Sequence, residues 1–276
     1  MKMSPHIIDG KKLALERELL LKVEVEKLTK KIGRKPKLVA VELADDEGSR
    51  LYLKLKKSVA ERVGIEFQIS NFKFPARLRM DEVQAGGQIS NFIDADGIFI
   101  QHPRGYDKQK WQELVDQIPP EKDVDCLTSE NLRLIKEGKP RFLPATVKAI
   151  LYCFKSDVLS GKKIVILGRS PMVGLPLYWW LKSLGADVSV VHSETSNEER
   201  VANCKNADVL ISCVGKPGLV TGNMVKDGVV VIDCGSPVGD VVFNEVAPKA
   251  SAITPVPGGV GPLTVVSLME NVVKSA

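Results

Sequence analysis

Residues 163–176 read Lys-Ile-Val-Ile-Leu-Gly-Arg-Ser-Pro-Met-Val-Gly-Leu-Pro, and this stretch decides the predicted fold. Its first five residues form a short β-branched apolar run, typical of a buried strand, and the apolar spacing from Leu175 onward is typical of a helix. Gly168 and Gly174 lie in the turn between them. Rossmann domains bind pyrophosphate at such a turn, because the backbone approaches closely and the helix N-terminus offers free N–H groups. The stretch therefore predicts a nucleotide-binding domain, although its turn reads GxSxxxG instead of GxGxxG.

Strands and helices are expected to alternate on both sides of this turn. The apolar runs predict strands at 37–43, 65–69, 96–101, 187–191, 208–212 and 229–233. The helical spacing predicts helices at 11–32, 49–63, 80–92, 107–117 and 262–274, with another of about a dozen residues after Pro144. Alternation of this kind favours parallel sheets covered by helices. We predict a two-domain α/β protein, with an N-terminal α/β substrate domain at 1–144, a Rossmann-type nucleotide domain at 145–261 and a C-terminal helix within 262–276 that returns to the first domain.

The composition argues against several classes of function. The chain has 276 residues, of which 44% are hydrophobic and 26% charged, and a net charge of +5, all ordinary for a globular protein. An apolar signal segment and a bilayer-length apolar run are both lacking, so we expect a cytoplasmic protein without membrane contact. Nucleic-acid binding would need a recognition motif or aromatic platforms beside the basic residues, and the sequence shows neither. We therefore expect no nucleic-acid partner. Five dispersed cysteines without metal-ligand spacing favour buried, reduced thiols and predict no metal site.

Residues around the glycine turn predict how a nucleotide binds. Arg169 lies within the turn, while His192 and Ser193 follow the second strand of the domain, where Rossmann sites bind ribose. Arg169 can pair with a 2′-phosphate, which favours NADP. The carboxylate of Glu194 would repel that phosphate unless it points outward, which favours NAD. We predict NADP, with NAD as the alternative, and expect Gly215 to flank the nicotinamide.

The helix at 49–63 carries a lysine on its apolar side. At roughly 100° per residue, Lys56 falls within an arc formed by Leu51, Tyr52, Leu55, Val59, Ala60 and Val63. Such a lysine either extends to water or lies in a cleft where desolvation lowers its pKa into a catalytic range. Tyr52 and Lys56 are four residues apart and project together, which favours the second interpretation.

Residues 254–264 read Thr-Pro-Val-Pro-Gly-Gly-Val-Gly-Pro-Leu-Thr, with three prolines and three glycines in eleven positions. Such a loop holds a fixed shape that a ligand can approach closely. It resembles the TPVPGGVGPMT signature of the methylenetetrahydrofolate dehydrogenase/cyclohydrolase family. Residues 49–56 resemble that family's SxxYxxxK motif, and its GRSxxVGxP pattern is matched by Gly168, Arg169, Ser170, Val173, Gly174 and Pro176. The resemblance runs from Ile7 to the C-terminal helix.

The resemblance implies an enzyme of one-carbon metabolism and purine biosynthesis. Such an enzyme oxidises 5,10-methylenetetrahydrofolate with NADP and hydrolyses the methenyl product to 10-formyltetrahydrofolate, as a homodimer through the nucleotide domains. Lys56 would transfer protons, Tyr52 would pack near the folate, Gln101 matches the glutamine of VQLPLP, and Asp125 matches the second aspartate of KDVDGF. The folate would also contact Ser49, Pro257, Gly258 and Gly259. The cofactor would contact Gly168, Arg169, Ser170, Val173, Gly174, His192, Ser193 and Gly215.

Some motifs depart from the family pattern. QLPLP reads Gln-His-Pro-Arg-Gly at 101–105, and KDVDGF reads Lys-Asp-Val-Asp-Cys-Leu at 122–127. A monofunctional dehydrogenase and a catalytically impaired folate- or nucleotide-binding homologue therefore stay open as alternatives. A Rossmann dehydrogenase of the shikimate or amino-acid type is a further alternative, but it gives no reason for the sequence of residues 254–264.

Overall fold

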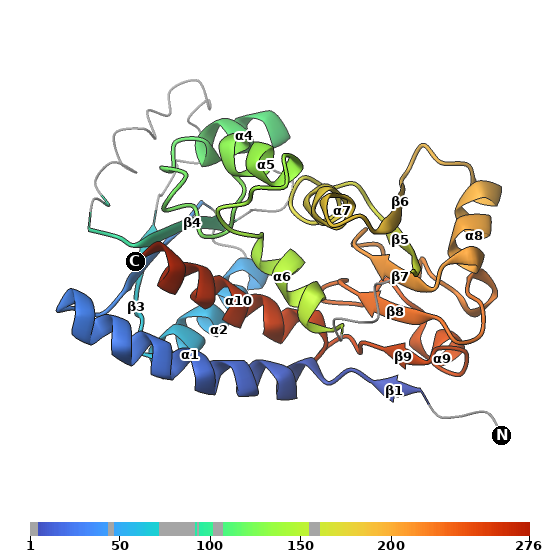
Figure 1. The fold of residues 1–276 in the computed structure, drawn as a ribbon, viewed down its shortest axis with the longest axis horizontal. Helices are drawn as coiled ribbons and strands as arrows, with labels where there is room; N and C mark the ends of the chain where they lie inside the picture. The colour runs from blue at the N-terminus through green and yellow to red at the C-terminus, as the bar shows by residue number, and fades with distance from the viewer. Residues whose placement is uncertain (1–4, 44–46, 72–91, 93, 102–106, 155–160) are drawn as a thin grey trace. The chain divides into compact units, whose positions relative to one another are not determined.

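The computed structural model describes residues 5–43, 47–71, 92, 94–101, 107–154 and 161–276, with their side chains except those of 47–49, 71 and 108. The chain forms two compact units, whose elements are labelled in Figure 1. The six-stranded unit comprises residues 1–15, 135–139 and 146–264, and the three-stranded unit comprises residues 16–134, 140–145 and 265–276. The chain passes between the units within its first and last helices and also at residues 134–135, 139–140 and 145–146.

The six-stranded unit contains one parallel sheet in the order β1-β9-β8-β7-β5-β6. Four strands are those expected from the sequence: β5 (Lys163–Leu167), β6 (Asp187–Val191), β7 (Val209–Ser212) and β8 (Val230–Asp233). The sheet is extended by β1 (His6–Ile7) and β9 (Ala252–Ile253). Two residues are too few for a periodic pattern, so the sequence did not indicate these strands.

Helices cover this sheet. α7 (Gly174–Ser183) packs on β5 and β6, and α8 (Asn197–Asn206) packs on β5. Val165, Leu167 and Leu210 share one face of the sheet and form a buried cluster with Cys204 and Val246. The shorter elements are α6 (Ala145–Tyr152), the 3-10 helix η2 (Gly222–Met224) and α9 (Phe243–Val246). A parallel, helix-covered sheet of this order confirms the predicted α/β class.

In the three-stranded unit, β2 (Lys37–Glu42) lies between β3 (Glu66–Asn71) and β4 (Gly97–Gln101), parallel to both. Residues 38–41 are fully buried, as expected for an apolar strand covered on both faces. The helices that contribute to this unit are α1 (Gly10–Ile32), α2 (Glu47–Val63), α4 (Lys108–Val115), α5 (Ser129–Lys136) and α10 (Val260–Ser275). The helix expected at 80–92 lies outside the described residues apart from Phe92, and α5 was not expected.

The C-terminal helix returns to the N-terminal part of the chain, as predicted. Residues 265–276 of α10 belong to the three-stranded unit. Arg17 Nε of α1 donates to Glu270 Oε1 of α10 at 2.6 Å. α10 begins at Val260, two residues before the expected start at Pro262.

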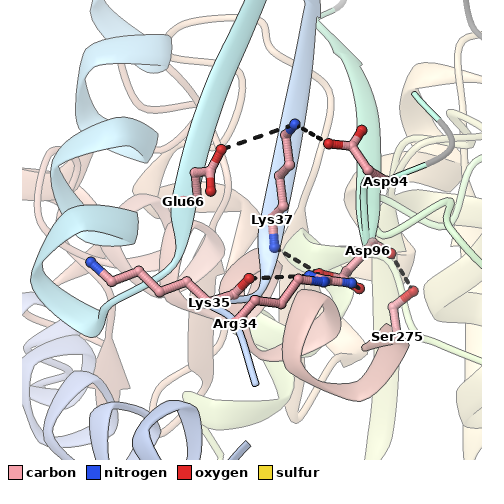
Figure 2. Close-up of polar contacts among 7 residues, drawn as sticks. All are labelled: Arg34, Lys35, Lys37, Glu66, Asp94, Asp96 and Ser275. Carbon is pink, nitrogen blue, oxygen red and sulfur yellow. Dashed lines mark hydrogen bonds and ion pairs between the residues drawn. The ribbon is translucent and has the colours of Figure 1, made fainter. Parts of the chain in front are cut away.

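Ion pairs fix the amino end of the three-stranded sheet (Figure 2). Asp96, directly before β4, accepts from both terminal nitrogens of Arg34 at 2.6 and 2.8 Å and from Lys37 N at 2.8 Å. Ser275 Oγ of α10 donates to Asp96 O at 2.6 Å. Lys37 Nζ donates to Asp94 at 2.5 Å. These contacts join β2, β4 and α10 at the end of the sheet opposite to Gln101.

Candidate active site and nucleotide site

Lys56 lies on the inward face of α2 and is only 9% exposed. Its Nζ donates to Gln101 Oε1 at 3.2 Å and lies 3.8 Å from the centroid of the Phe99 ring. Phe99 and Gln101 are two residues apart on β4, so their side chains share one face of the sheet. Gln101 ends β4, and parallel α/β sheets bind ligands at the carboxyl ends of their strands. Phe99 was missed in the sequence, although its spacing from Gln101 is a usable signal.

The predicted apolar arc of α2 is partly wrong. Lys56 is buried, as expected, but Leu51 and Leu55 are 58% and 48% exposed, and Leu53 is buried instead. The buried face therefore runs through Leu53, Lys56 and Ala60. Positions 51, 53 and 55 are all leucine. Composition could not distinguish them, and contact with the sheet decides which one is buried.

Burial shifts the pKa values of Lys56 and Asp125 in opposite directions. Desolvation lowers the pKa of Lys56, and the nearby Asp125 carboxylate offsets part of that effect. Burial raises the pKa of Asp125, and the charge of Lys56 offsets part of that rise. We conclude that each group is held closer to its neutral form than in water. A neutral amine in such a place can accept a proton at moderate pH.

The loop that carries Asp125 is fixed by α10. Asn271 Nδ2 donates to Val124 O at 2.8 Å and to Leu143 O at 2.9 Å, so the C-terminal helix holds the residue before Asp125. Cys126, directly after Asp125, has a φ of 61°, a conformation that favours glycine. Cys126, which stands where the family motif has glycine, therefore adopts a left-handed backbone. Sequence reasoning missed Asn271 because its contacts lie more than a hundred residues away along the chain.

The remaining predicted substrate residues are only partly described. Tyr52 lies one turn before Lys56 on α2 and is partly buried. The main chain of Ser49 belongs to α2, but its side chain lies outside the described residues, as do residues 102–106. The three-stranded unit thus brings Lys56 and Gln101 into contact, with Asp125 close enough for its charge to act on the lysine.

The backbone of the turn after β5 forms a cradle that leaves no room for a side chain at its two glycines. Gly168 has a φ of 104°, and a Cβ there would lie 2.7 Å from Cys213 O. A Cβ on Gly174, the first residue of α7, would lie 2.1 Å from Gly168 O. Ser170 Oγ accepts from Val173 N at 3.2 Å, which orders the residues between the two glycines. Both positions require glycine, and the cradle at the start of α7 fits a pyrophosphate.

Arg169 and Glu194 form an ion pair in this unit. In the sequence, Arg169 favoured NADP and Glu194 favoured NAD. The structure pairs the two side chains. His192 Nδ1 accepts from Glu194 N at 3.3 Å, and Thr195 Oγ1 accepts from His192 N at 3.2 Å. Ser193 is exposed beside them. The turn after β6 therefore directs the Glu194 carboxylate toward Arg169.

A buried carboxylate holds the loop after β7. Asp240 Oδ2 accepts from Ser212 Oγ at 2.7 Å, from Val214 N at 2.9 Å and from Gly215 N at 3.2 Å. Gly215 has a φ of 73°, in the left-handed region. Asp240 is fully buried. Sequence reasoning missed it because no local pattern links position 240 to the loop.

The Pro/Gly loop packs against the start of α1. Gly258, directly after Pro257, has a φ of 107°, and its carbonyl accepts from Lys11 N at 3.1 Å. A Cβ on Gly10 would lie 1.8 Å from Gly259 O. The expected fixed shape is therefore made by contact between two segments of the six-stranded unit. Pro257, Gly258 and Gly259 lie in this unit, whereas Lys56, Gln101 and Asp125 lie in the other.

The described part of the chain shows no group of three or more His, Cys, Asp or Glu side chains that could hold a metal ion. None of its helices is long and apolar enough to cross a membrane. All five cysteines are free. Cys126 and Cys204 are buried as predicted, but Cys153, Cys213 and Cys234 are partly exposed.

Comparison with known families assigns both parts of the chain. Residues 8–125 match the family model of the tetrahydrofolate dehydrogenase/cyclohydrolase catalytic domain, and residues 144–276 match that of the NAD(P)-binding domain of the same family. The chain is 41% identical to "Bifunctional protein FolD 2" of Lactobacillus johnsonii, over 97% of this chain and 96% of that protein. It is 40% identical to "Bifunctional protein FolD" of Bacillus licheniformis, over 99% of this chain and 98% of that protein.

Solved structures agree with these sequence matches. The bifunctional FolD methylenetetrahydrofolate dehydrogenase/cyclohydrolase of Campylobacter jejuni superposes with a TM-score of 0.89 and 33% identity, over 99% of this chain and 98% of that one. The Trypanosoma brucei enzyme, solved with NADP and an inhibitor, gives a TM-score of 0.89 and 30% identity, over 99% and 97% of the two chains. The resemblance seen in the sequence motifs is thereby confirmed: the chain belongs to the tetrahydrofolate dehydrogenase/cyclohydrolase family.

Proposed function

We propose that this protein is a bifunctional enzyme that oxidises 5,10-methylenetetrahydrofolate with NADP and hydrolyses the methenyl product to 10-formyltetrahydrofolate. Both family domains and relatives named as bifunctional support the assignment. The observation that carries it is the buried Lys56, hydrogen-bonded to Gln101 on the face of Phe99. A desolvated lysine on α2, bonded to the last residue of a parallel strand, suits proton transfer in the hydrolytic step.

Lys56 acts on the attacking water in this proposal. In its neutral form it accepts a proton as water adds to the methenyl carbon, and it returns a proton to the ring nitrogen as the carbon–nitrogen bond breaks. Gln101 orients the amine through the 3.2 Å hydrogen bond. Asp125, Tyr52 and Ser49 hold the pterin.

The six-stranded unit binds the nucleotide in this proposal. When bound, NADP accepts the hydride of the oxidation step. Gly168, Ser170, Val173 and Gly174 form the pyrophosphate cradle, because neither glycine position has room for a side chain and the backbone at the start of α7 is left open to a phosphate. On the ribose and nicotinamide sides we assign Arg169, His192, Ser193 and Gly215. Pro257, Gly258 and Gly259 form a rigid loop for the substrate.

The Arg169–Glu194 ion pair sets the choice between NADP and NAD. A 2′-phosphate must compete with Glu194 for the guanidinium, so Glu194→Gln should lower KM for NADP while KM for NAD changes little. An equal fall in KM for NADP and KM for NAD in Glu194→Gln would contradict this role. Arg169→Ala removes the guanidinium itself, and it should raise KM for NADP while KM for NAD stays unchanged.

The finer assignments follow from the same family membership. We infer a cytoplasmic role in one-carbon metabolism and purine biosynthesis, with folate binding in residues 1–144 and 262–276 and nucleotide binding in residues 145–261. These limits differ from the compact units, in which residues 1–15, 135–139 and 262–264 belong to the six-stranded unit and residue 145 belongs to the three-stranded unit. We also infer a homodimer through the nucleotide domain, where Tyr178, Trp179 and Trp180 of α7 are partly exposed. Light scattering after gel filtration measures the oligomeric state.

The test of the function uses purified protein, 5,10-methylenetetrahydrofolate and either NADP or NAD. Reduced nicotinamide and the methenyl chromophore are followed separately. Reduced cofactor without methenyl accumulation is the result expected for both activities. Methenyl accumulation would mean a monofunctional dehydrogenase, and no reaction with either cofactor would overturn the proposal.

A further inference from the structure

Two cysteines that are distant in sequence meet at the carboxyl end of the six-stranded sheet. Cys213 directly follows β7, Cys234 directly follows β8, and their Sγ atoms are 3.8 Å apart. In the parallel ladder Ser212 lies opposite Asp233, so the cysteines occupy the next pair of positions. Cys234 N donates to Ser212 O at 2.9 Å, which extends the pairing to this level.

The backbone around Cys213 is held on both sides. The Asp240 carboxylate accepts from Ser212 Oγ at 2.7 Å and from Val214 N at 2.9 Å, the residues before and after Cys213. Asp240 is fully buried, and hydrogen bonds to a buried carboxylate are among the stronger ones in proteins.

The backbone around Cys234 is held by a second buried carboxylate. Asp233 Oδ1 accepts from Gly235 N at 2.8 Å and from Asp240 N at 3.0 Å. Because Asp240 N is bonded to Asp233 while its side chain is bonded around Cys213, one network positions both thiols. Their proximity is thus fixed by the main chain.

This geometry fits a disulfide. Neighbouring strands lie about 4.8 Å apart, within the Cα separation of roughly 4.4–6.8 Å found across disulfides. The sulfur atoms must approach by about 1.8 Å from their 3.8 Å separation to reach bonding distance. Cys213 and Cys234 are partly exposed as residues, whereas Cys126 and Cys204 are buried.

We propose that Cys213 and Cys234 form a redox-active dithiol, which a small-molecule disulfide such as oxidised glutathione converts reversibly to an intramolecular disulfide. The Cys213 thiolate attacks one sulfur of the oxidant, whose S–S bond breaks and releases one thiolate. The Cys234 thiolate then attacks Cys213 Sγ and releases the second thiolate. The protein loses two protons and two electrons, and the oxidant becomes two thiols.

The order of attack follows from the surroundings of the thiols. The neighbouring Cys213 thiol, together with burial, raises the pKa of Cys234 well above its ordinary value. A raised pKa leaves Cys234 with little thiolate, which suits the thiol that reacts second. Cys213 takes the first step and Cys234 resolves the mixed disulfide.

The consequence for activity rests on the function proposed above. Bond formation draws Cys213 away from the position that lets Val214 and Gly215 bond to Asp240. The loop after β7 lies where Rossmann domains bind the cofactor. Oxidation should therefore raise the Kd for NADP by roughly fivefold or more, the factor that corresponds to about 1 kcal/mol. The hydrolysis of methenyltetrahydrofolate, which needs no nucleotide, should keep its rate.

The experiment incubates the full-length protein with excess oxidised glutathione, blocks the remaining thiols with an alkylating agent and identifies linked peptides by mass spectrometry. A Cys213–Cys234 link that dithiothreitol reverses is the expected result. Five alkylated thiols, or a Cys153–Cys234 link in its place, would overturn the proposal. The peptide result does not depend on catalysis, so it stands even if the proposed function fails.

Two variants separate the steps. Cys234→Ser should accumulate glutathione on Cys213, because the resolving thiol is missing, and Cys213→Ser should accumulate much less on Cys234. Cys204→Ser is the matched control and should form the normal link. The NADP titration is then repeated on oxidised and reduced wild-type protein, and equal Kd values would overturn the coupling to the nucleotide site.

Discussion

The two ends of strand β4 hold cations in opposite ways. At the amino end, the Asp96 carboxylate takes two hydrogen bonds from Arg34, whose side chain is 51% exposed (Figure 2). At the carboxyl end, Gln101 offers Lys56 only a neutral amide oxygen, and the lysine is 9% exposed. The hydrogen bond to Asp96 raises the pKa of Arg34, whereas burial lowers that of Lys56. A cation paired with a carboxylate stays charged and fixes structure, and one buried beside an amide becomes available for proton transfer.

The largest effect is expected from removing the buried cation. Lys56→Met keeps most of the side-chain volume and removes the amine, so the rate of methenyltetrahydrofolate hydrolysis should fall by roughly 10²- to 10⁴-fold, the usual contribution of a general acid–base group. Lys57→Met is the control, because that neighbour is 51% exposed and should retain activity. A normal rate for Lys56→Met in a stopped-flow assay would remove the lysine from the mechanism.

The second prediction makes the carboxyl end of β4 resemble the amino end. Gln101→Glu places a carboxylate against Lys56 and should raise the pKa of that lysine. The hydrolytic pH–rate profile should shift to higher pH, with a loss of roughly 10- to 100-fold at neutral pH, since each pKa unit of a base is worth up to a factor of ten. Gln101→Leu is the control: it should slow the reaction without the upward shift. An unchanged pH–rate profile in Gln101→Glu would show that the partner at position 101, amide or carboxylate, does not set the pKa of Lys56.

The third prediction breaks the amino end. Asp96→Ala leaves Arg34 and Lys37 N without their shared acceptor and should reduce the free energy of unfolding by about 1–3 kcal/mol. Urea unfolding measures this loss, and kcat should not change in the folded enzyme. Asp94→Asn should shift the urea midpoint much less, because that carboxylate is exposed and surface ion pairs contribute little. A loss of kcat with unchanged stability in Asp96→Ala would mean that the two ends are coupled.

The smallest effect concerns pH and stability. A lowered lysine pKa means that the unfolded state binds more protons between the folded value and the ordinary 10.5, so the cost of burying Lys56 shrinks as pH rises through that range. Asp125, with a raised pKa, acts in the opposite sense above 3.8. The stability of Lys56→Met relative to wild type should therefore decline as pH rises toward 10.5, by about 1.4 kcal/mol per unit of pKa difference. Parallel stability curves for the two proteins would show that Lys56 has an ordinary pKa.

Much of this site was visible in the sequence, and the misses have a common cause. The glycine turn, the strand ends and the position of Lys56 on the buried side of α2 were expected because they depend on local spacing. Asn271 and Asp240 were not expected, since their contacts link segments that no periodic pattern relates. Phe99 was missed although it lies two residues before Gln101 on the same strand, because its contact is with a lysine of another segment. The pairing of Arg169 with Glu194 was also missed, because two charges near one site do not reveal their own geometry.

The sequence by itself determined the alternation of strands and helices, the glycines of the cradle and the family signatures, because backbone conformation and hydrophobic period act over a few residues. Only the tertiary structure decided which leucine of α2 is buried and which aromatic ring lies against Lys56. It also decided that two cysteines directly after adjacent strands face each other. The physical reason is that desolvation and pairing depend on what packs against a group, and the chain supplies those neighbours from positions far away in sequence.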